Sequence, residues 1–200
     1  MNIKKMLPSS IYEFLKERYH NANRKLSPVV CTDIISEPFS RKFGMDRGMP
    51  IDRFYIERFL ADNASFIHGN LMEIAETKYS NKFGKNGSVN YVLSYDNAGD
   101  STDGNIITGD LTKMETIPEG IIDCFICTQT LNFLYDVKSA IRGINRILRK
   151  KGVALVTVSG LSQISQYDYK RWGDYWRFTD LSIGKLFAET FEPEKIKVFS

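Results

Sequence analysis

Four apolar segments, separated by turn residues and helical patterns, constrain the fold of this 200-residue chain more than any other feature. Each segment is short and predominantly apolar, as buried strands are. The predicted strands are 70–75, 89–95, 121–128 and 152–159, with a shorter one at 105–108. Because helical patterns alternate with these strands, the sequence predicts an α/β fold with a mostly parallel sheet and helices on both faces.

The clearest helical pattern lies in residues 136–152, where apolar residues recur every three or four positions. Asp136 can cap this helix and Gly152 can end it. Further helices are predicted in residues 9–22, from Pro50 onward and from about Thr179 onward, and a last strand in residues 195–200. In the helix that begins at Pro50, Asp52 falls on the apolar arc, either to satisfy free backbone amides or to take part in a site.

The composition is that of a soluble globular domain, with 42% hydrophobic and 26% charged residues. A net charge of +3, spread along the chain, gives no argument for nucleic-acid binding. No apolar run is long enough to span a bilayer, and the first residues lack the apolar stretch of a signal peptide. These features predict a cytoplasmic protein without a membrane span.

Cysteine and histidine usage gives no indication of a metal site. Cys124 and Cys127 lie three residues apart in a predicted strand, so their side chains point to opposite faces of the sheet. A shared metal or a disulfide is therefore awkward, and two buried thiols are the better interpretation. His20 and His68 are too few and too far apart to form a metal site.

Polar residues follow several predicted strands at the edge where an α/β sheet binds its ligands. Glu73 and Ala75 end the first strand, Asp96 follows the second, Asp110 lies in the segment TGDL, and Thr128 ends the fourth. Because the carboxyl ends of parallel strands share one edge, we expect these residues to surround a single binding site.

The order of these motifs resembles that of class I S-adenosylmethionine-dependent methyltransferases. The segment IIDCFICTQTLNFLYDVKSAIRGINRILRKKGVALVTVSG is similar to the second half of their domain. Two flanking stretches, FGMDRGMPIDRFYIERFL and ISQYDYKRWGDYWRFT, are similar to a bacterial group associated with glycosyltransferases and surface-polysaccharide synthesis. The resemblance covers roughly residues 38–200 and leaves residues 1–37 as a predicted N-terminal helical extension.

The resemblance implies a Rossmann-like three-layer sandwich and S-adenosylmethionine as the cofactor. In this family the acid after the second strand binds the ribose, a position matched by Asp96. The aspartate beside the adenine amine is matched by Asp110, and Leu111 and Thr128 are further predicted cofactor contacts. From the residues alone, Asp96 can equally be a turn residue and Asp110 a cap or Asx-turn.

The first strand is not followed by the glycine-rich turn of this family, since no glycine appears before Gly84. From Glu76 to Val89 the chain has fourteen residues, so the first crossover helix must be very short or absent. S-adenosylmethionine carries no phosphate that would require such a turn. We assign its ammonium to Glu73 and the 76–79 backbone, and its carboxylate to Arg47 or Arg53, as a hypothesis.

A cluster of aromatic and charged residues follows the last predicted strand. Trp172, Tyr175, Trp176 and Arg177 are predicted to bind a methyl acceptor, since aromatic faces stack on sugar rings. Asp174 is the first candidate for the proton acceptor and Asp168 the second. Alternatively, the loop is a packed plug in which Arg177 pairs with Asp174.

The leading interpretation is a methyltransferase acting on a small molecule or a glycan hydroxyl. The alternatives are a non-catalytic scaffold domain of the same fold and a nicotinamide-dependent oxidoreductase, the latter disfavoured because a pyrophosphate would have no host. The family resemblance also implies that the C-terminal hairpin is incomplete at Ser200. An exposed sheet edge favours a homodimer, and the resemblance allows association with a glycosyltransferase.

Overall fold

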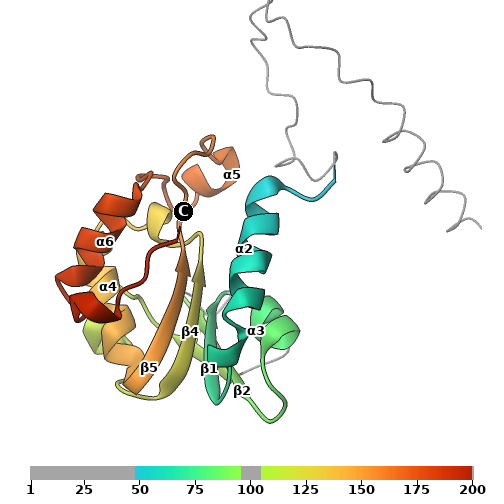
Figure 1. Cartoon of the computed structure of the whole chain (residues 1–200). Coiled ribbons are helices and arrows are strands. Elements are labelled where there is room, and N and C mark those ends of the chain that lie inside the picture. Colours follow the sequence, from blue (N-terminus) through green and yellow to red (C-terminus); the bar gives the residue numbers. More distant parts are fainter. Residues whose placement is uncertain (1–47, 96–104, 200) are drawn as a thin grey trace, which may run out of the picture. The chain divides into compact units, whose positions relative to one another are not determined.

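The computed structural model describes residues 48–95 and 105–199, which lie in one compact unit beginning at Gly48. Five strands form one sheet in the order β3-β2-β1-β4-β5, and every neighbouring pair is parallel (Figure 1). The strands are β1 (Asn70–Ile74), β2 (Val89–Ser94), β3 (Asn105–Thr108), β4 (Ile122–Thr128) and β5 (Leu148–Thr157). The predicted parallel α/β sheet is confirmed.

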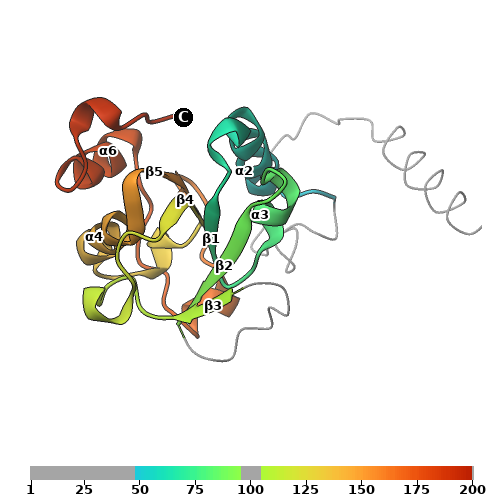
Figure 2. The same ribbon diagram turned by 90° about the horizontal axis from the view of Figure 1, so that it is seen from below.

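Helices cover both faces of this sheet. They are α2 (Ile51–Asp62), α3 (Lys78–Phe83), α4 (Val137–Ile147), α5 (Gln166–Tyr169) and α6 (Asp180–Ala188). Short 3-10 turns occupy Ala64–Phe66, Met114–Thr116, Leu131–Phe133 and Pro193–Lys195. Helices α2 and α3 lie on one face, and α4 and α6 lie on the other (Figure 2). The fold is therefore a three-layer sandwich, as predicted.

The alternation of side chains along the strands creates two separate cores. On β4, Cys124 and Ile126 pack with α2 and α3, whereas Phe125 and Cys127 pack with α4. On β1, Leu71 belongs to the first of these cores and Met72 to the second. The two cysteines are buried, unpaired and on opposite faces of the sheet, which confirms the interpretation of two core thiols.

The junction between α4 and β5 differs from the prediction. The helix ends at Ile147, and the strand begins at once because Leu148 pairs with Ile122 of β4. Gly152 therefore does not end the helix; it lies within β5, where an added Cβ would come within 2.9 Å of the Ile122 carbonyl oxygen. The residue with positive φ is Lys151, at 70°. Asp136 caps the helix as predicted, accepting a hydrogen bond from the Ser139 amide.

Helix α2 also corrects one detail of the sequence analysis. Its buried residues are Ile56 and Leu60, and Asp52 is exposed to solvent. The buried face is narrower than the predicted apolar arc, because Tyr55 is 61% exposed. Asp52 is therefore not a carboxylate that faces the core.

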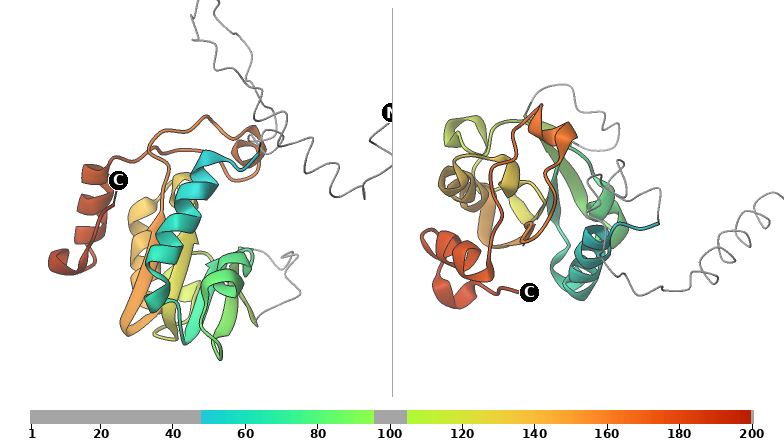
Figure 3. Two further views of the ribbon diagram at one scale, coloured as in Figure 1. Left: turned by 45° about the vertical axis from the view of Figure 1, so that its right-hand side comes forward. Right: turned by 90° about the horizontal axis from the view of Figure 1, so that it is seen from above.

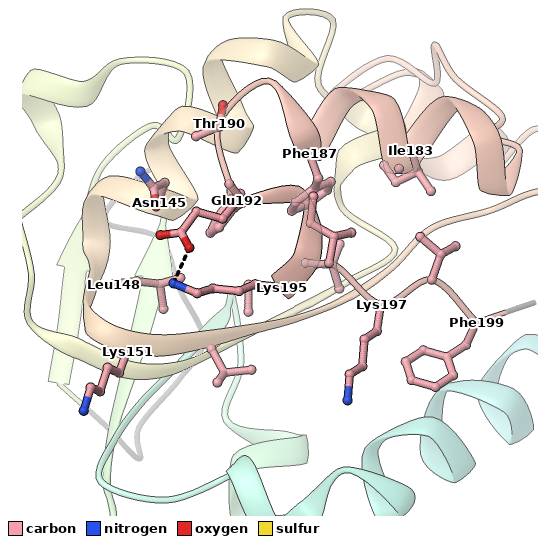
Figure 4. Close-up of a pocket in the computed structure, with 18 of the residues that line it drawn as sticks. Asn145, Leu148, Lys151, Ile183, Phe187, Thr190, Glu192, Lys195, Lys197 and Phe199 are labelled. Atoms are coloured by element: carbon pink, nitrogen blue, oxygen red, sulfur yellow. Dashed lines mark ion pairs between the residues drawn. The ribbon is translucent and has the colours of Figure 1, made fainter.

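The C-terminal segment does not form the predicted strand. After α6, a 3-10 turn at Pro193–Lys195 leads into irregular backbone up to Phe199, whose ring lies 5.8 Å from that of Phe59 on α2. Within the described residues, β5 consequently pairs on one side only, with β4. A groove of about 890 Å³ runs along this edge, between β5, α6 and the C-terminal segment (Figure 4).

Candidate functional site

The carboxyl ends of the strands meet at one edge, and the sheet order reverses there between β1 and β4. Such a reversal is where open α/β sheets bind ligands. At this point both strands end in a left-handed backbone: φ is 64° at Ala75, after β1, and 51° at Gln129, after β4. Non-glycine residues in this conformation are strained and cluster at functional sites. The geometry thus marks the predicted edge as the candidate site.

The turn after β1 keeps the backbone shape that a glycine would adopt, although alanine occupies the position. The Ala75 amide donates to the Leu93 carbonyl at the end of β2, which holds the turn against the sheet. Ala75 and Glu76 are exposed, while Thr77 is buried beneath them. Residues 75–77, here called the β1 tip, therefore present backbone to the edge. The helix that follows, α3, is only six residues long, which confirms the predicted short crossover.

Glu73 lies beneath this tip and is 3% exposed. One carboxylate oxygen accepts a hydrogen bond from the Tyr79 amide at 3.1 Å. The other accepts from the Ser80 amide at 2.6 Å and from the Ser80 hydroxyl at 2.7 Å. Burial raises the pKa of Glu73, and the bonds from Ser80 and Tyr79 partly oppose that rise. The carboxylate is thus bonded to α3, whereas the sequence analysis assigned it to the cofactor.

The segment after β3 forms an Asx-turn, one of the alternatives left open for Asp110. Its Oδ1 accepts from the Thr112 amide at 2.8 Å and from the Thr112 hydroxyl at 2.7 Å. Its Oδ2 lies 3.7 Å from the Lys113 ammonium. Leu111 is buried against α4, where Gly143 lets the helix approach the Leu111 carbonyl. The turn is rigidly anchored beside the edge of the sheet.

The remaining predicted cofactor contacts fall in three places. Thr128 ends β4 next to Gln129, with its carbonyl accepting from the Thr130 hydroxyl. Arg53 lies on α2 and donates to the Tyr79 hydroxyl at 3.3 Å, so it faces α3. Arg47 and Asp96 lie outside the described residues, and their predicted roles stay predictions.

The connection after β5 is fixed by one ion pair. Arg177 meets Asp174 through two contacts, at 2.5 and 2.9 Å, and also donates to the carbonyls of Ser162 and Gln163. The Asp174 side chain is 1% exposed. The hydrogen bonds from Arg177 hold the pKa of Asp174 below its usual range. A carboxylate engaged in this way fits the alternative of a packed loop better than a proton acceptor.

Asp168 lies in the first turn of α5. Its Oδ2 accepts from the Ser165 hydroxyl at 2.6 Å, while the Asp168 amide donates back to that hydroxyl at 3.2 Å. This reciprocal pair caps the short helix. Asp168 and Asp174 are both half-buried residues, although the Asp174 side chain by itself is only 1% exposed.

The connection after β5 lies over the carboxyl edge of the sheet (Figure 3), and aromatic contacts link it to the strand ends. The ring of Trp172 lies 5.9 Å from that of Tyr95, the residue that follows β2. Farther along, the Tyr175 amide donates to the Asn132 carbonyl, and the Trp176 indole donates to the Leu134 carbonyl. The connection therefore spans from the end of β5 to the end of β2, across the point where the sheet order reverses.

Three residues of this site were not singled out from the sequence: Tyr95, Asn132 and Tyr135. Tyr135 pairs with Tyr175 at a ring distance of 5.4 Å and with Trp176 at 6.0 Å. Each of the three follows β2 or β4 by a few residues. Their position relative to the strand ends is a local signal, but their partners are distant in sequence.

The groove along β5 is separate from this site. It is lined mainly by β5, α6 and the C-terminal segment, and none of the predicted site residues lines it (Figure 4). Its surface combines apolar residues such as Val156 and Phe187 with lysines such as Lys151 and Lys197. This groove is therefore not the candidate cofactor site.

Neither thiol nor metal chemistry is apparent in the described ranges. Burial raises the pKa of Cys124 and of Cys127 to about 12, so neither thiol is a ready nucleophile. No group of three or more potential metal ligands occurs among residues 48–95 and 105–199. None of the helices in the described part has the length and apolar character needed to cross a bilayer.

Comparisons with known proteins agree with this architecture. A family model described as a methyltransferase domain matches residues 69–156, which include β1 and most of β5. The fold is a Rossmann-like methyltransferase fold. The family match implies S-adenosylmethionine as the cofactor. A comparison with curated proteins gives no match.

Three solved structures illustrate the likeness. An S-adenosylmethionine-dependent methyltransferase from Archaeoglobus fulgidus has a TM-score of 0.52 and 8% identity, covering 74% of this chain and 71% of that one. A chain of the complex between the Haloferax volcanii Trm112 methyltransferase activator and a methyltransferase has a TM-score of 0.50, 12% identity and coverages of 76% and 77%. The [4+2]-cyclase SpnF has a TM-score of 0.50, 15% identity and coverages of 70% and 56%. At these identities the likeness shows the fold alone.

Proposed function

We propose that this chain is an S-adenosylmethionine-dependent methyltransferase acting on a hydroxyl group of a small molecule or a glycan. The observation that carries the proposal is the connection after β5, which crosses the edge where the sheet order reverses and brings Trp172 against Tyr95. A ligand at this edge is enclosed between the strand ends and an aromatic cover. Exclusion of water and alignment are what methyl transfer requires of a protein.

In this proposal the β1 tip and the Asp110–Leu111 turn receive the cofactor, with Thr128 beside them and Asp96 on the ribose. When bound, S-adenosylmethionine supplies an electrophilic methyl group. The backbone of Ala75 has the left-handed conformation, which in this proposal lets the backbone of the β1 tip approach the ligand. Arg53 or Arg47 is the proposed partner of the methionine carboxylate, and a charge-assisted contact of that kind favours Arg.

For the acceptor, Trp172 and Tyr175 provide exposed aromatic faces, 47% and 49% exposed, that suit a sugar ring. Asp168 is the better proposed proton acceptor, because Asp174 is held by Arg177 with a lowered pKa. In this arrangement Asp174 and Arg177 shape the loop. Trp176 anchors it to the segment after β4.

Calorimetric titration with S-adenosylmethionine and S-adenosylhomocysteine tests the function. Wild-type chain should bind both, and Asp96→Ala should weaken binding by about tenfold or more, since a charge-assisted hydrogen bond is lost. The control is Asp62→Ala, which removes an exposed carboxylate at the end of α2, 71% exposed and paired loosely with Arg58. Full binding by Asp96→Ala would contradict the assignment of the ribose site.

A scaffold domain is the second candidate, favoured by a specific observation. The first amides of α3 are bonded to Glu73, so the turn after β1 offers fewer free donors than a glycine-rich turn. The likeness to a cyclase is consistent with one fold hosting different roles. A folded chain that binds neither S-adenosylmethionine nor S-adenosylhomocysteine would favour this candidate.

The proposed partners follow from the same features. The open edge of β5 supports pairing with a second copy of the chain, which light scattering over a range of protein concentrations would detect. Association with a glycosyltransferase rests on the sequence resemblance alone, as does a role in polysaccharide synthesis. A cytoplasmic location is proposed from composition.

A further inference from the structure

The segment between β1 and α3 forms a closed loop of hydrogen bonds. It leaves β1 after Ile74, makes the β1 tip, and returns through Tyr79 and Ser80 to the carboxylate of Glu73 on the strand. Both carboxylate oxygens are engaged, so the two ends of the segment are tied to one buried group. Thr77 and Ser80 are also linked, since the Ser80 hydroxyl lies 3.0 Å from the Thr77 carbonyl.

We propose that Glu73 is a positioning residue for the cofactor: through Tyr79 and Ser80 it holds α3 and thereby fixes the exposed β1 tip. The proposal rests on the proposed function and assigns Glu73 no contact with S-adenosylmethionine. The glycine-rich turn is thus replaced by a carboxylate that ties a short helix to the strand. We call the three bonds between Glu73, Tyr79 and Ser80 the latch.

The surroundings explain why the latch is needed. A helix of six residues is too short to be stable by itself, so α3 depends on tertiary contacts. Tyr79 is 2% exposed and packs in the α2 core, and its hydroxyl accepts from Arg53. Ala75 is strained, and such a conformation persists only when the surroundings enforce it. The latch supplies that enforcement from beneath the tip.

The latch requires two acceptor oxygens on one side chain. In Glu73→Gln the amide oxygen can still accept from Ser80, but the amide NH₂ then faces the Tyr79 amide. Two donors oppose each other, and a buried N–H is left without an acceptor. The tip would then occupy its binding-competent shape for a smaller fraction of the time, which lowers the apparent affinity by that fraction.

The test combines amide hydrogen exchange with calorimetry on the full chain. In Glu73→Gln we expect faster exchange at Tyr79 and Ser80, and binding of S-adenosylmethionine about tenfold weaker. Ser80→Ala removes only the hydroxyl bond and should weaken binding about threefold at most. The matched control, Glu189→Gln, removes a carboxylate on the C-terminal side of α6 that is 51% exposed and paired with Lys138, and should leave both measurements unchanged.

Two results would overturn the proposal: exchange at Tyr79 and Ser80 that is unchanged in Glu73→Gln, or faster exchange with unchanged cofactor affinity. If Glu73→Gln does not fold, the wild-type chain provides the test. In the proposal, cofactor binding and formation of the latch stabilise each other. Saturating S-adenosylmethionine should then slow exchange at Tyr79 and Ser80, and unchanged rates would overturn the coupling. A wild-type chain that binds no cofactor would instead remove the proposed function, while its exchange rates still show whether Glu73 holds α3.

Discussion

Glu73 lies beneath the β1 tip and Asp174 lies in the connection after β5, and both carboxylates are almost completely buried. Their surroundings shift the pKa in opposite directions. Glu73 has only neutral donors, from Tyr79 and Ser80, and burial raises its pKa. Asp174 faces the guanidinium of Arg177, whose hydrogen bonds lower its pKa. Burial alone therefore does not decide the direction in which a carboxyl pKa shifts; the charge of the hydrogen-bond donor also matters.

The comparison also separates two ways of holding a loop. The β1 tip is short and is held by Glu73. Burial raises the pKa of this carboxyl group, whereas the hydrogen bonds from Tyr79 and Ser80 lower it. The connection after β5 is long and is held by an ion pair that favours ionisation. In both carboxylates each oxygen already accepts at least one hydrogen bond from a neighbouring protein group.

The largest expected effect concerns two buried thiols, Cys124 and Cys127, whose pKa values are raised mainly by burial. Burial raises the pKa of both thiols from 9.0 to about 12. The thiolate fraction near neutral pH should fall about a thousandfold, and alkylation by iodoacetamide should slow at least as much. The measurement uses Cys31→Ser chain, native and in urea, with labelled sites located by mass spectrometry. Rapid native labelling of either thiol would contradict burial as the dominant cause.

Removal of Arg177 should have the next largest effect. Arg177→Met leaves Asp174 charged and buried without its cation, which should lower the free energy of unfolding by about 3 kcal/mol. Urea unfolding at neutral pH measures this. The control is Arg58→Met, because the pair of Arg58 with Asp62 is exposed and its atoms are 4.0 Å apart. That change should lower the free energy of unfolding by less than about 0.5 kcal/mol. Equal losses in both variants would show that the Arg177–Asp174 pair stabilises the fold no more than an exposed pair does.

Relief of backbone strain in the β1 tip should have a smaller effect of opposite sign. Ala75→Gly removes the Cβ from a residue with φ of 64°, and we expect a gain of about 1 kcal/mol in unfolding free energy. Ala61→Gly on the exposed side of α2 should lose up to about 1 kcal/mol. Thermal unfolding of the two variants, side by side, gives the signs. A loss at Ala75 would show that the tip is not strained in solution.

The sheet could be predicted from the sequence because its signal is local. Each observed strand other than β5 begins and ends within about one residue of its prediction, since apolar runs bounded by turns depend little on context. The strand predictions were wrong where the local structure depends on a pairing partner that is distant in sequence. Leu148 enters β5 because it pairs with Ile122, and residues 195–199 give no strand because apolar alternation alone does not provide a pairing partner.

The candidate site shows the same division between local features, which could be predicted, and contacts that depend on partners distant in sequence. Strand ends and short crossovers are local properties, so the edge and the reduced α3 were predictable. The pairing of Arg177 with Asp174 was one of two alternatives that the sequence left open, and the geometry selects it. The bonds of Glu73 were missed, because they depend on how the chain turns at Ala75, where no glycine marks the left-handed conformation.

The smallest expected effect tests the sign of the Glu73 pKa shift. Because burial raises the folded-state pKa above 4.5, the native chain keeps this proton in a pH range where the unfolded chain has lost it. The stability contributed by Glu73 is then full below the unfolded pKa and is lost as the pH rises through the folded pKa. Glu73→Gln cannot titrate, so its unfolding free energy relative to wild type should rise as the pH rises through the folded-state pKa of Glu73.

Urea unfolding at several pH values measures this difference, with Glu189→Gln as the control for removing an exposed carboxylate. The change should be modest, because the bonds from Tyr79 and Ser80 oppose the effect of burial. A relative stability that falls as the pH rises would mean that these neutral donors outweigh burial. Glu73 would then have a lowered pKa, as Asp174 does. Three neutral hydrogen-bond donors would in that case offset the burial of a carboxylate as one guanidinium does.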